Sequence, residues 1–149
     1  MRSDRGAMSD REVDLLLSLR FLGDEVRPDT ISRTLRAEPT HAFNKGDHRI
    51  GTAGVRHRAN GWIVDFWSTS RRKPKPQWQR LVAFLSARHR EFDELEELGI
   101  RGELFCSVFP TRTAGHSLAL ANRVLSELAR CHLDLVQDLH ATDGHDERA

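Results

Sequence analysis

The strongest constraint on the fold is that apolar side chains recur at every second position over residues 13–22. One set of alternate positions is wholly apolar, and it comprises Val13, Leu15, Leu17, Leu19 and Phe21. Side chains of a β-strand point alternately to its two faces, so this period predicts a strand with one strongly apolar face. The other face is mixed, which is typical of a central strand that is partly covered on its second side. We therefore expect this strand at the middle of a layered domain.

A short helix is expected after this strand. Proline is tolerated at the first helical position, so Pro28 can open a helix whose narrow apolar stripe is Ile31 and Leu35. The following residues, 39–54, contain one proline and three glycines and show little periodicity. They are expected to form a long connection, and long ordered loops often carry function.

The next signal is a hairpin. The pair Asn60-Gly61 favours a two-residue type I′ turn, with strands expected at residues 55–59 and 62–68. On the second of these strands, Trp62 is expected to point into the core.

The second half of the chain predicts two helices and two strands. Residues 76–98 have helical periodicity, but one straight helix of that length would be about 35 Å long, so we expect a break within residues 86–90. A strand is predicted at residues 100–109 and a helix after Ser117. Residues 132–139 are expected to close the fold as a last strand.

The expected fold class is α+β, with the element order β-α-β-β-α-β-α-β. The first six elements match a ferredoxin-like split βαβ arrangement, which predicts a mixed sheet with helices mainly on one face. A single domain is expected over residues 12–140. The polar ends, residues 1–11 and 141–149, are expected to be disordered.

Composition excludes several classes of protein. Hydrophobic residues make up 38% of the chain and charged residues 30%, and no apolar run approaches the ~20 residues of a membrane-spanning helix. A secretory signal is not expected, because the first residues lack an apolar stretch. The two cysteines, Cys106 and Cys131, are flanked by leucine or valine and are expected to be buried thiols of a cytoplasmic protein.

Several short motifs follow one another in a set order: residues 18–35 (SLRFLGDEVRPDTISRTL), Glu38-Pro39-Thr40, Lys45-Gly46-Asp47, Trp67-Ser68, and the closing helix and Leu-Asp-Leu strand. Over residues 15–139, this order resembles a known bacterial family, the domain of unknown function DUF4279. The resemblance implies a small cytosolic bacterial protein, of a kind found among toxin-immunity and accessory proteins. It implies no particular activity.

The motif Lys45-Gly46-Asp47 allows two interpretations. A glycine can expose backbone N–H groups beside a cation and a carboxylate, which would suit a ligand or partner contact. Alternatively, the segment is only a turn in which Asp47 accepts backbone hydrogen bonds, and glycine and aspartate serve that purpose far more often. The spacing of a phosphate-binding P-loop is missing.

No catalytic, metal or cofactor motif emerges from the sequence. The spacing of His41, His48 and His57 fits no standard zinc pattern, and a Gly-x-Ser-x-Gly nucleophile motif is absent. His89 falls on the apolar stripe of a helix and is expected to be a satisfied core histidine rather than a metal ligand. We therefore expect no catalytic residues, no metal and no cofactor.

Nucleic acid is disfavoured as a partner. The net charge is +1, and the stretch from Asn60 onward lacks the arrangement that places stacking rings in RNA-recognition motifs. Trp67 is the ambiguous residue here, because it could contact a helix or form an exposed platform.

The leading hypothesis is a non-enzymatic protein-interaction module of the bacterial cytoplasm, of the immunity kind. Its predicted contact residues are Lys45, Asp47, Trp67, Arg71 and Arg72, on the sheet face and in the 39–54 loop. One alternative is a small-ligand domain or enzyme that uses the same loop as a pocket wall. Another is a single-stranded nucleic-acid binder that uses Trp67 and the basic loop after it. The sequence does not indicate an oligomeric state.

Overall fold

The computed structural model describes residues 13–70, 72–110 and 119–140 and has an α+β fold. Its elements are β1 (Val13–Gly23), α1 (Pro28–Leu35), β2 (His41–Phe43), β3 (Asn60–Asp65), α2 (Pro74–Ser86), α3 (His89–Glu97), β4 (Glu103–Pro110), α4 (Asn122–Arg130) and β5 (Asp134–Leu139). The ends that were expected to be disordered, residues 1–11 and 141–149, lie outside the described residues.

The five strands form one mixed sheet in the order β2-β3-β1-β4-β5. β1 pairs antiparallel with both β3 and β4, β2 pairs antiparallel with β3, and β5 runs parallel to β4. The prediction that residues 13–22 form the central strand is confirmed.

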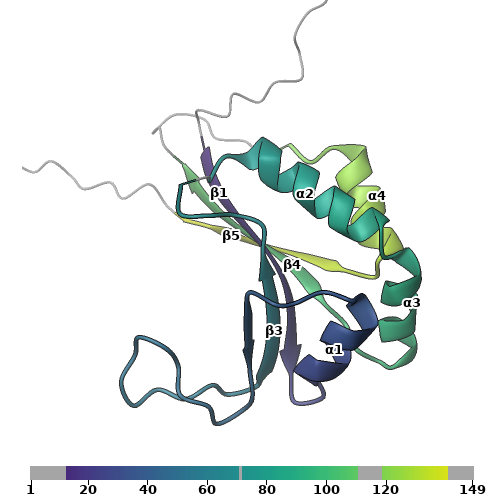
Figure 1. Ribbon diagram of the computed structural model, residues 1–149. Helices are drawn as coiled ribbons and strands as arrows, with labels where there is room; N and C mark the ends of the chain where they lie inside the picture. Colours follow the sequence, from purple (N-terminus) through teal and green to yellow (C-terminus); the bar gives the residue numbers. More distant parts are fainter. Residues whose placement is uncertain (1–12, 71, 111–118, 141–149) are drawn as a thin grey trace, which may run out of the picture.

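The helices cover one face of this sheet, as Figure 1 shows. α2 packs on β1, α1 on β3 and α4 on β5, while α3 packs against α1. The core between the layers contains the apolar face of β1 and its neighbours, including Leu15, Leu17, Leu19, Phe21, Ile31, Trp62, Leu81, Leu85, Phe92 and Leu104. Trp62 is fully buried, as predicted, and its indole N–H donates to the Ser32 hydroxyl at 2.9 Å. The opposite face of the sheet carries no described helix.

The predicted break in the long helix is confirmed, and it makes the order β-α-β-β-α-α-β-α-β rather than the expected order with three helices. Arg88 lies in the break between α2 and α3. Its guanidinium donates to the backbone oxygen of Leu35 at 2.9 Å and to that of Phe84 at 3.1 Å, and it stacks 3.9 Å above the Phe84 ring. One side chain therefore caps the carboxyl ends of both α1 and α2, whose last carbonyls lack helical partners.

The predicted turn at Asn60-Gly61 is wrong, because both residues begin β3 and pair with β1. Gly61 is not in the left-handed conformation that a type I′ turn requires. It lies opposite Phe43 on β2, and a Cβ at this position would be 2.1 Å from the Phe43 ring. The glycine is needed for this close approach of ring and backbone, not for a turn.

The first half of β1 has a strand neighbour on one side only, since β3 pairs with β1 from Ser18 onward. On the open side, the side chain of Gln77 from α2 replaces a strand. Its amide oxygen accepts the N–H of Leu17 at 2.9 Å, and its amide nitrogen donates to the oxygen of Leu15 at 2.6 Å. Gln77 is fully buried, so water cannot substitute for these bonds.

We predict that Gln77→Met lowers the free energy of unfolding by about 2–6 kcal/mol. Methionine has a similar length, but it leaves a buried N–H and a buried C=O on β1 without partners, at a cost of about 1–3 kcal/mol each. Urea unfolding followed by circular dichroism measures the change, and Gln79→Met, at an exposed position of the same helix, is the control. Equal stability of the two variants would show that β1 does not depend on Gln77.

Candidate functional site

A two-stranded arm, residues 44–59, leaves the sheet between β2 and β3. Its backbone forms a ladder: Gly46 N–H donates to His57 O at 2.9 Å, His57 N–H to Asp47 O at 2.8 Å, and Arg49 N–H to Val55 O at 2.8 Å. Figure 1 shows the arm extending away from the helical layer. The chain thus makes a long hairpin here in place of the predicted loop and short turn.

The base of the arm is fixed to the sheet by an aromatic stack. The rings of Phe43 and His57 lie nearly parallel with centroids 3.6 Å apart, and Phe43 in turn covers Gly61. Asn60 adds a polar tie, because its side-chain oxygen accepts the N–H of Lys45 at 2.7 Å and its nitrogen donates to Asp24 O at 3.3 Å.

A groove of about 1040 Å³ lies between the arm and the helix-free face of the sheet. Its walls come from β1, β2, β3 and the arm, and the lining residues are Arg20, Leu22, Thr40, His41, Ala42, Phe43, Asp47, His48, Arg49, Ile50, Val55, Arg56, His57, Arg58 and Ile63.

The charge of the groove is strongly one-sided. Four arginines line it against a single carboxylate, Asp47. Arg20 is already paired, 2.6 Å from Glu103. Arg49, Arg56 and Arg58, by contrast, form no ion pair with any carboxylate of the described residues, although Arg56 donates to the backbone oxygen of Gly46 at 3.1 Å. Three guanidinium groups are therefore available to an anionic partner.

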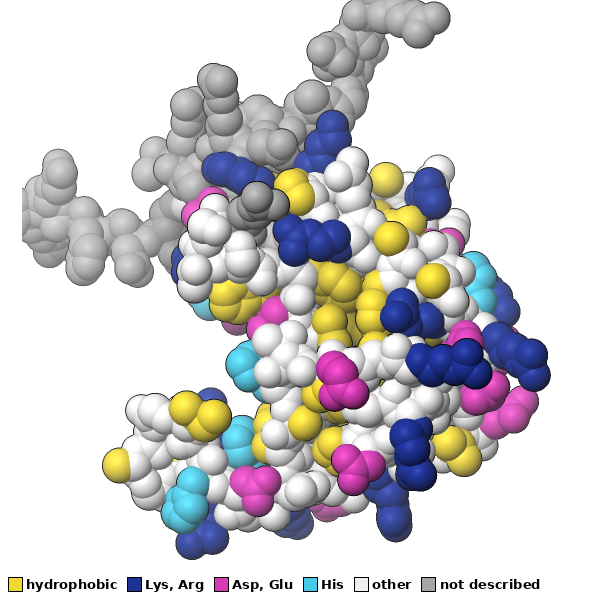
Figure 2. All heavy atoms as spheres, in the orientation of Figure 1, with side chains coloured by type: hydrophobic (Ala, Val, Ile, Leu, Met, Phe, Trp, Pro, Cys, Tyr) yellow, Lys and Arg dark blue, Asp and Glu magenta, His cyan; other side chains and the backbone are white. Residues whose placement is uncertain are grey.

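The groove also gathers exposed apolar side chains. Leu22, Ile50 and Val55 are 43%, 99% and 38% exposed, and they are three of the six large exposed hydrophobic residues of the described chain. Figure 2 shows the arm standing out from the body, with apolar and histidine side chains around the notch beneath it. Apolar side chains clustered with unpaired cations are typical of a binding surface.

Two of the predicted contact residues lie at the base of the arm. Asp47 lines the groove, and its carboxylate accepts the N–H of Asn44 at 2.8 Å. This hydrogen bond closes a turn, as the alternative interpretation of the Lys45-Gly46-Asp47 motif predicted. The Lys45 ammonium lies 3.6 Å from the Asp24 carboxylate in an exposed pair, which stabilises the fold by at most ~1 kcal/mol.

Two other predicted contact residues, Trp67 and Arg72, lie toward the far end of β1. Trp67 is half-buried beyond the end of β3, and the backbone oxygen of Arg72 accepts the N–H of Leu15 at 2.8 Å. Arg71 lies outside the described residues. The structure does not bring the four described residues of this set together, because the arm leaves the sheet at the opposite end of β1.

The three histidines of this region do not gather into a metal site within the described chain. His41 lies 3.2 Å from the Asp65 carboxylate, and His57 stacks on Phe43. Both therefore have structural partners within the described chain.

Comparison with protein families gives one match. The model of the domain of unknown function DUF4279 matches residues 11–142, most of the chain. The chain belongs to the DUF4279 family. No curated protein and no solved structure matches it. Within the described part of this DUF4279 chain, no helix is both long and apolar enough to cross a membrane.

Sequence reasoning missed the residues that make the groove of this DUF4279 protein. Arg49, Ile50, Arg56 and Arg58 were not singled out, because residues 55–59 were assigned to a separate hairpin strand. One signal was available: residues 44–59 contain four cations and one acid, a net charge of +3. These positive side chains line one groove only because the segment folds back on itself as a hairpin.

A second polar cluster joins α3 to the end of α4. Asp93 accepts two hydrogen bonds from the Arg130 guanidinium, at 2.7 and 3.0 Å, and one from His132 at 2.8 Å. The hydrogen bonds from Arg130, and then those from His132, lower the pKa of Asp93 from 3.8 to about 2. The charged carboxylate therefore links the two helices.

We predict that Asp93→Asn lowers the melting temperature at pH 7 and that its difference from wild type shrinks as the pH falls from 3.8 to about 2. A depressed pKa in the folded state stabilises the protein above the unfolded pKa, and this stabilisation is lost as the carboxylate becomes protonated. Thermal melts across this range test the prediction, with Glu97→Gln, an exposed residue of the same helix, as the control. A difference that persists unchanged at pH 2 would contradict it.

Proposed function

We propose that this protein is a non-enzymatic binding protein of the bacterial cytoplasm, immunity-like in character, that holds an acidic segment of a partner protein in the groove beneath the arm. The observation that carries the proposal is the combination of unpaired arginines and exposed apolar side chains in one groove. An acidic segment with one or two apolar side chains would complement both.

The electrostatic argument rests on Arg49, Arg56 and Arg58. Guanidinium groups bind carboxylates in bidentate fashion and are enriched at interface hot spots. Because no described carboxylate pairs with these three, a partner would not have to break an existing ion pair in order to reach them.

The apolar argument rests on Ile50, which is 99% exposed on the arm. An isoleucine left in water loses the stabilisation of roughly 1.5–3 kcal/mol that burial would give. Together with Leu22 and Val55 it offers an apolar strip along a groove bordered by positive charge. Contact with a partner side chain would recover part of this energy.

The size and shape of the groove favour a chain segment over a small molecule. Its volume of about 1040 Å³ lies slightly above the usual range for ligand pockets, ~300–1,000 Å³. A small-ligand site or an enzyme that uses the arm as a wall is the alternative, and the presence of Asp47 in the lining is the observation that favours it.

We also propose that the first four strands form a ferredoxin-like split βαβ unit. The sheet order β2-β3-β1-β4 supports this assignment, since β3 lies between β1 and β2 and pairs antiparallel with both. β5 would then be an addition at the edge of the unit. In this arrangement the helix-free face and the arm together form the recognition surface.

We predict that peptides selected from a random twelve-residue display library on the purified protein combine Asp or Glu with apolar residues. Binding of a selected peptide, measured by fluorescence anisotropy, should weaken at least about tenfold in Arg56→Glu/Arg58→Glu, since removal of a charged hot-spot contact costs more than 1.4 kcal/mol. Ile50→Asp should also weaken it. Arg80→Glu, at an exposed position on α2 in the helical layer, should leave the affinity unchanged.

Three outcomes would overturn the proposal. If the library yields no acidic peptides, or if Arg80→Glu weakens binding as much as the groove variants, the groove is not the recognition site. If a single-stranded oligonucleotide binds instead, with a steep salt dependence that the same arginine substitutions abolish, the nucleic-acid hypothesis replaces this one.

A further inference from the structure

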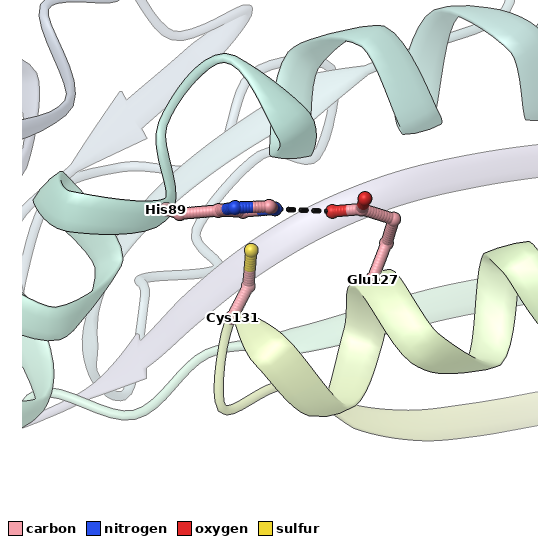
Figure 3. A group of neighbouring side chains, drawn as sticks. All are labelled: His89, Glu127 and Cys131. Carbon is pink, nitrogen blue, oxygen red and sulfur yellow. Dashed lines mark hydrogen bonds and ion pairs between the residues drawn. The ribbon is translucent and has the colours of Figure 1, made fainter.

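Three metal-ligating side chains meet between α3 and α4, away from the groove. His89 is the first residue of α3, Glu127 lies on the facing side of α4, and Cys131 follows one turn later, directly after the end of that helix. Their ligand atoms all lie within 4.8 Å of one another, and His89 Nε2 is 2.6 Å from Glu127 Oε2. Figure 3 shows the three side chains pointing toward one another.

We propose that His89, Glu127 and Cys131 form a Zn²⁺ site. An imidazole nitrogen, a carboxylate oxygen and a thiolate sulfur are the three protein ligand types that zinc uses. With zinc–ligand distances of ~2.0–2.3 Å and tetrahedral angles, neighbouring ligand atoms lie ~3.3–3.6 Å apart. The hydrogen-bonded His89–Glu127 pair would open by less than about 1 Å to reach that spacing.

The spacing of the ligands along the chain suits this arrangement. Glu127 and Cys131 are four residues apart, so they lie above one another on the same face of a helical turn. His89 reaches them from a separate helix, which begins at the break that Arg88 stabilises. The fold therefore holds two ligands on one element and the third on another, so the side chains require only small adjustments.

The surrounding charges leave the cluster accessible to a cation. Arg130 is adjacent in sequence, but both of its terminal nitrogens bind Asp93. Glu127 has no ion-pair partner among the described Lys and Arg residues; its described partner is His89. A carboxylate and a thiolate would balance the two positive charges of zinc.

The burial of the three side chains defines what kind of site this would be. The Cys131 residue is 2% exposed, whereas the side chains of Glu127 and His89 are 15% and 35% exposed. The Cys131 sulfur would thus be the ligand on the buried side of the zinc ion. Water could occupy the fourth coordination position on the solvent side, as in zinc sites with three protein ligands. Burial raises the pKa of the Cys131 thiol to about 12, so zinc would displace a proton on binding.

Titration of the purified, reduced protein with Co²⁺, a spectroscopic substitute for Zn²⁺, tests this proposal. We predict a near-ultraviolet thiolate-to-cobalt charge-transfer band that excess Zn²⁺ abolishes. The chain has two cysteines, so the band can arise only from Cys131 or Cys106. It should be lost in Cys131→Ser and retained in Cys106→Ser, the matched control at the other buried thiol.

The two partly exposed ligands, His89 and Glu127, provide variants outside the buried core. His89→Gln and Glu127→Gln should each weaken Co²⁺ binding by at least about tenfold, the lower limit for perturbation of a zinc site. Circular dichroism confirms that each variant is folded. The absence of a charge-transfer band at saturating Co²⁺ in the wild type, or a band that survives Cys131→Ser, would overturn the assignment and leave His89–Glu127 as a hydrogen bond between helices.

Discussion

The fold depends on the hydrogen bonds made by the backbone of β1 on the side where no described strand pairs with it. The central strand must be buried for its apolar face to form the core, yet its first half has β4 on one side and no strand of the described residues on the other. Every backbone group of Leu15 and Leu17 on that side nevertheless has a partner: the Gln77 amide binds one N–H and one C=O, and the backbone of Arg72 and Phe66 binds the others. A buried strand without these partners would lose several hydrogen bonds at once. Gln77 therefore fixes α2 on the sheet as well as completing β1.

Patterns confined to one element could be predicted from the sequence, and interactions between distant elements could not. The alternation at residues 13–22 predicted β1 correctly because a strand with one buried face leaves its period in the sequence. The break between α2 and α3 followed from helix length alone. By contrast, Gln77 is an ordinary polar residue within a helical pattern, and its bonds reach residues about 60 positions away. The turn predicted at Asn60-Gly61 was wrong for the same reason. Glycine is required at position 61 because the Phe43 ring of the neighbouring strand lies against its backbone.

For the groove, the sequence pattern predicted the region of the chain but not most of the residues that line it. The loop that includes Lys45 and Asp47 was expected to be either a contact site or only a turn, and the structure uses Asp47 in a turn. The three arginines without a described ion-pair partner lie on both halves of the arm, Arg49 on the outgoing half and Arg56 and Arg58 on the returning half. Trp67 and Arg72 were grouped with them by chemistry alone. The register of β3 against β1 separates the two sets, since Gly23 lies opposite Asn60 while Leu17 bonds to Phe66 near the other end. Only that register shows which polar residues can act together.

Charge is distributed unevenly between the two sides of the molecule. The net charge is only +1, yet the arm carries four cations and one acid, while α3 carries five acids and one arginine. Figure 1 places α3 in the helical layer and the arm on the side away from it. Such a separation creates a field that would draw an anionic molecule toward the arm and repel it from α3. A nearly neutral protein can therefore favour one docking orientation, and the helix-free sheet face beneath the arm is the surface that such an orientation would present.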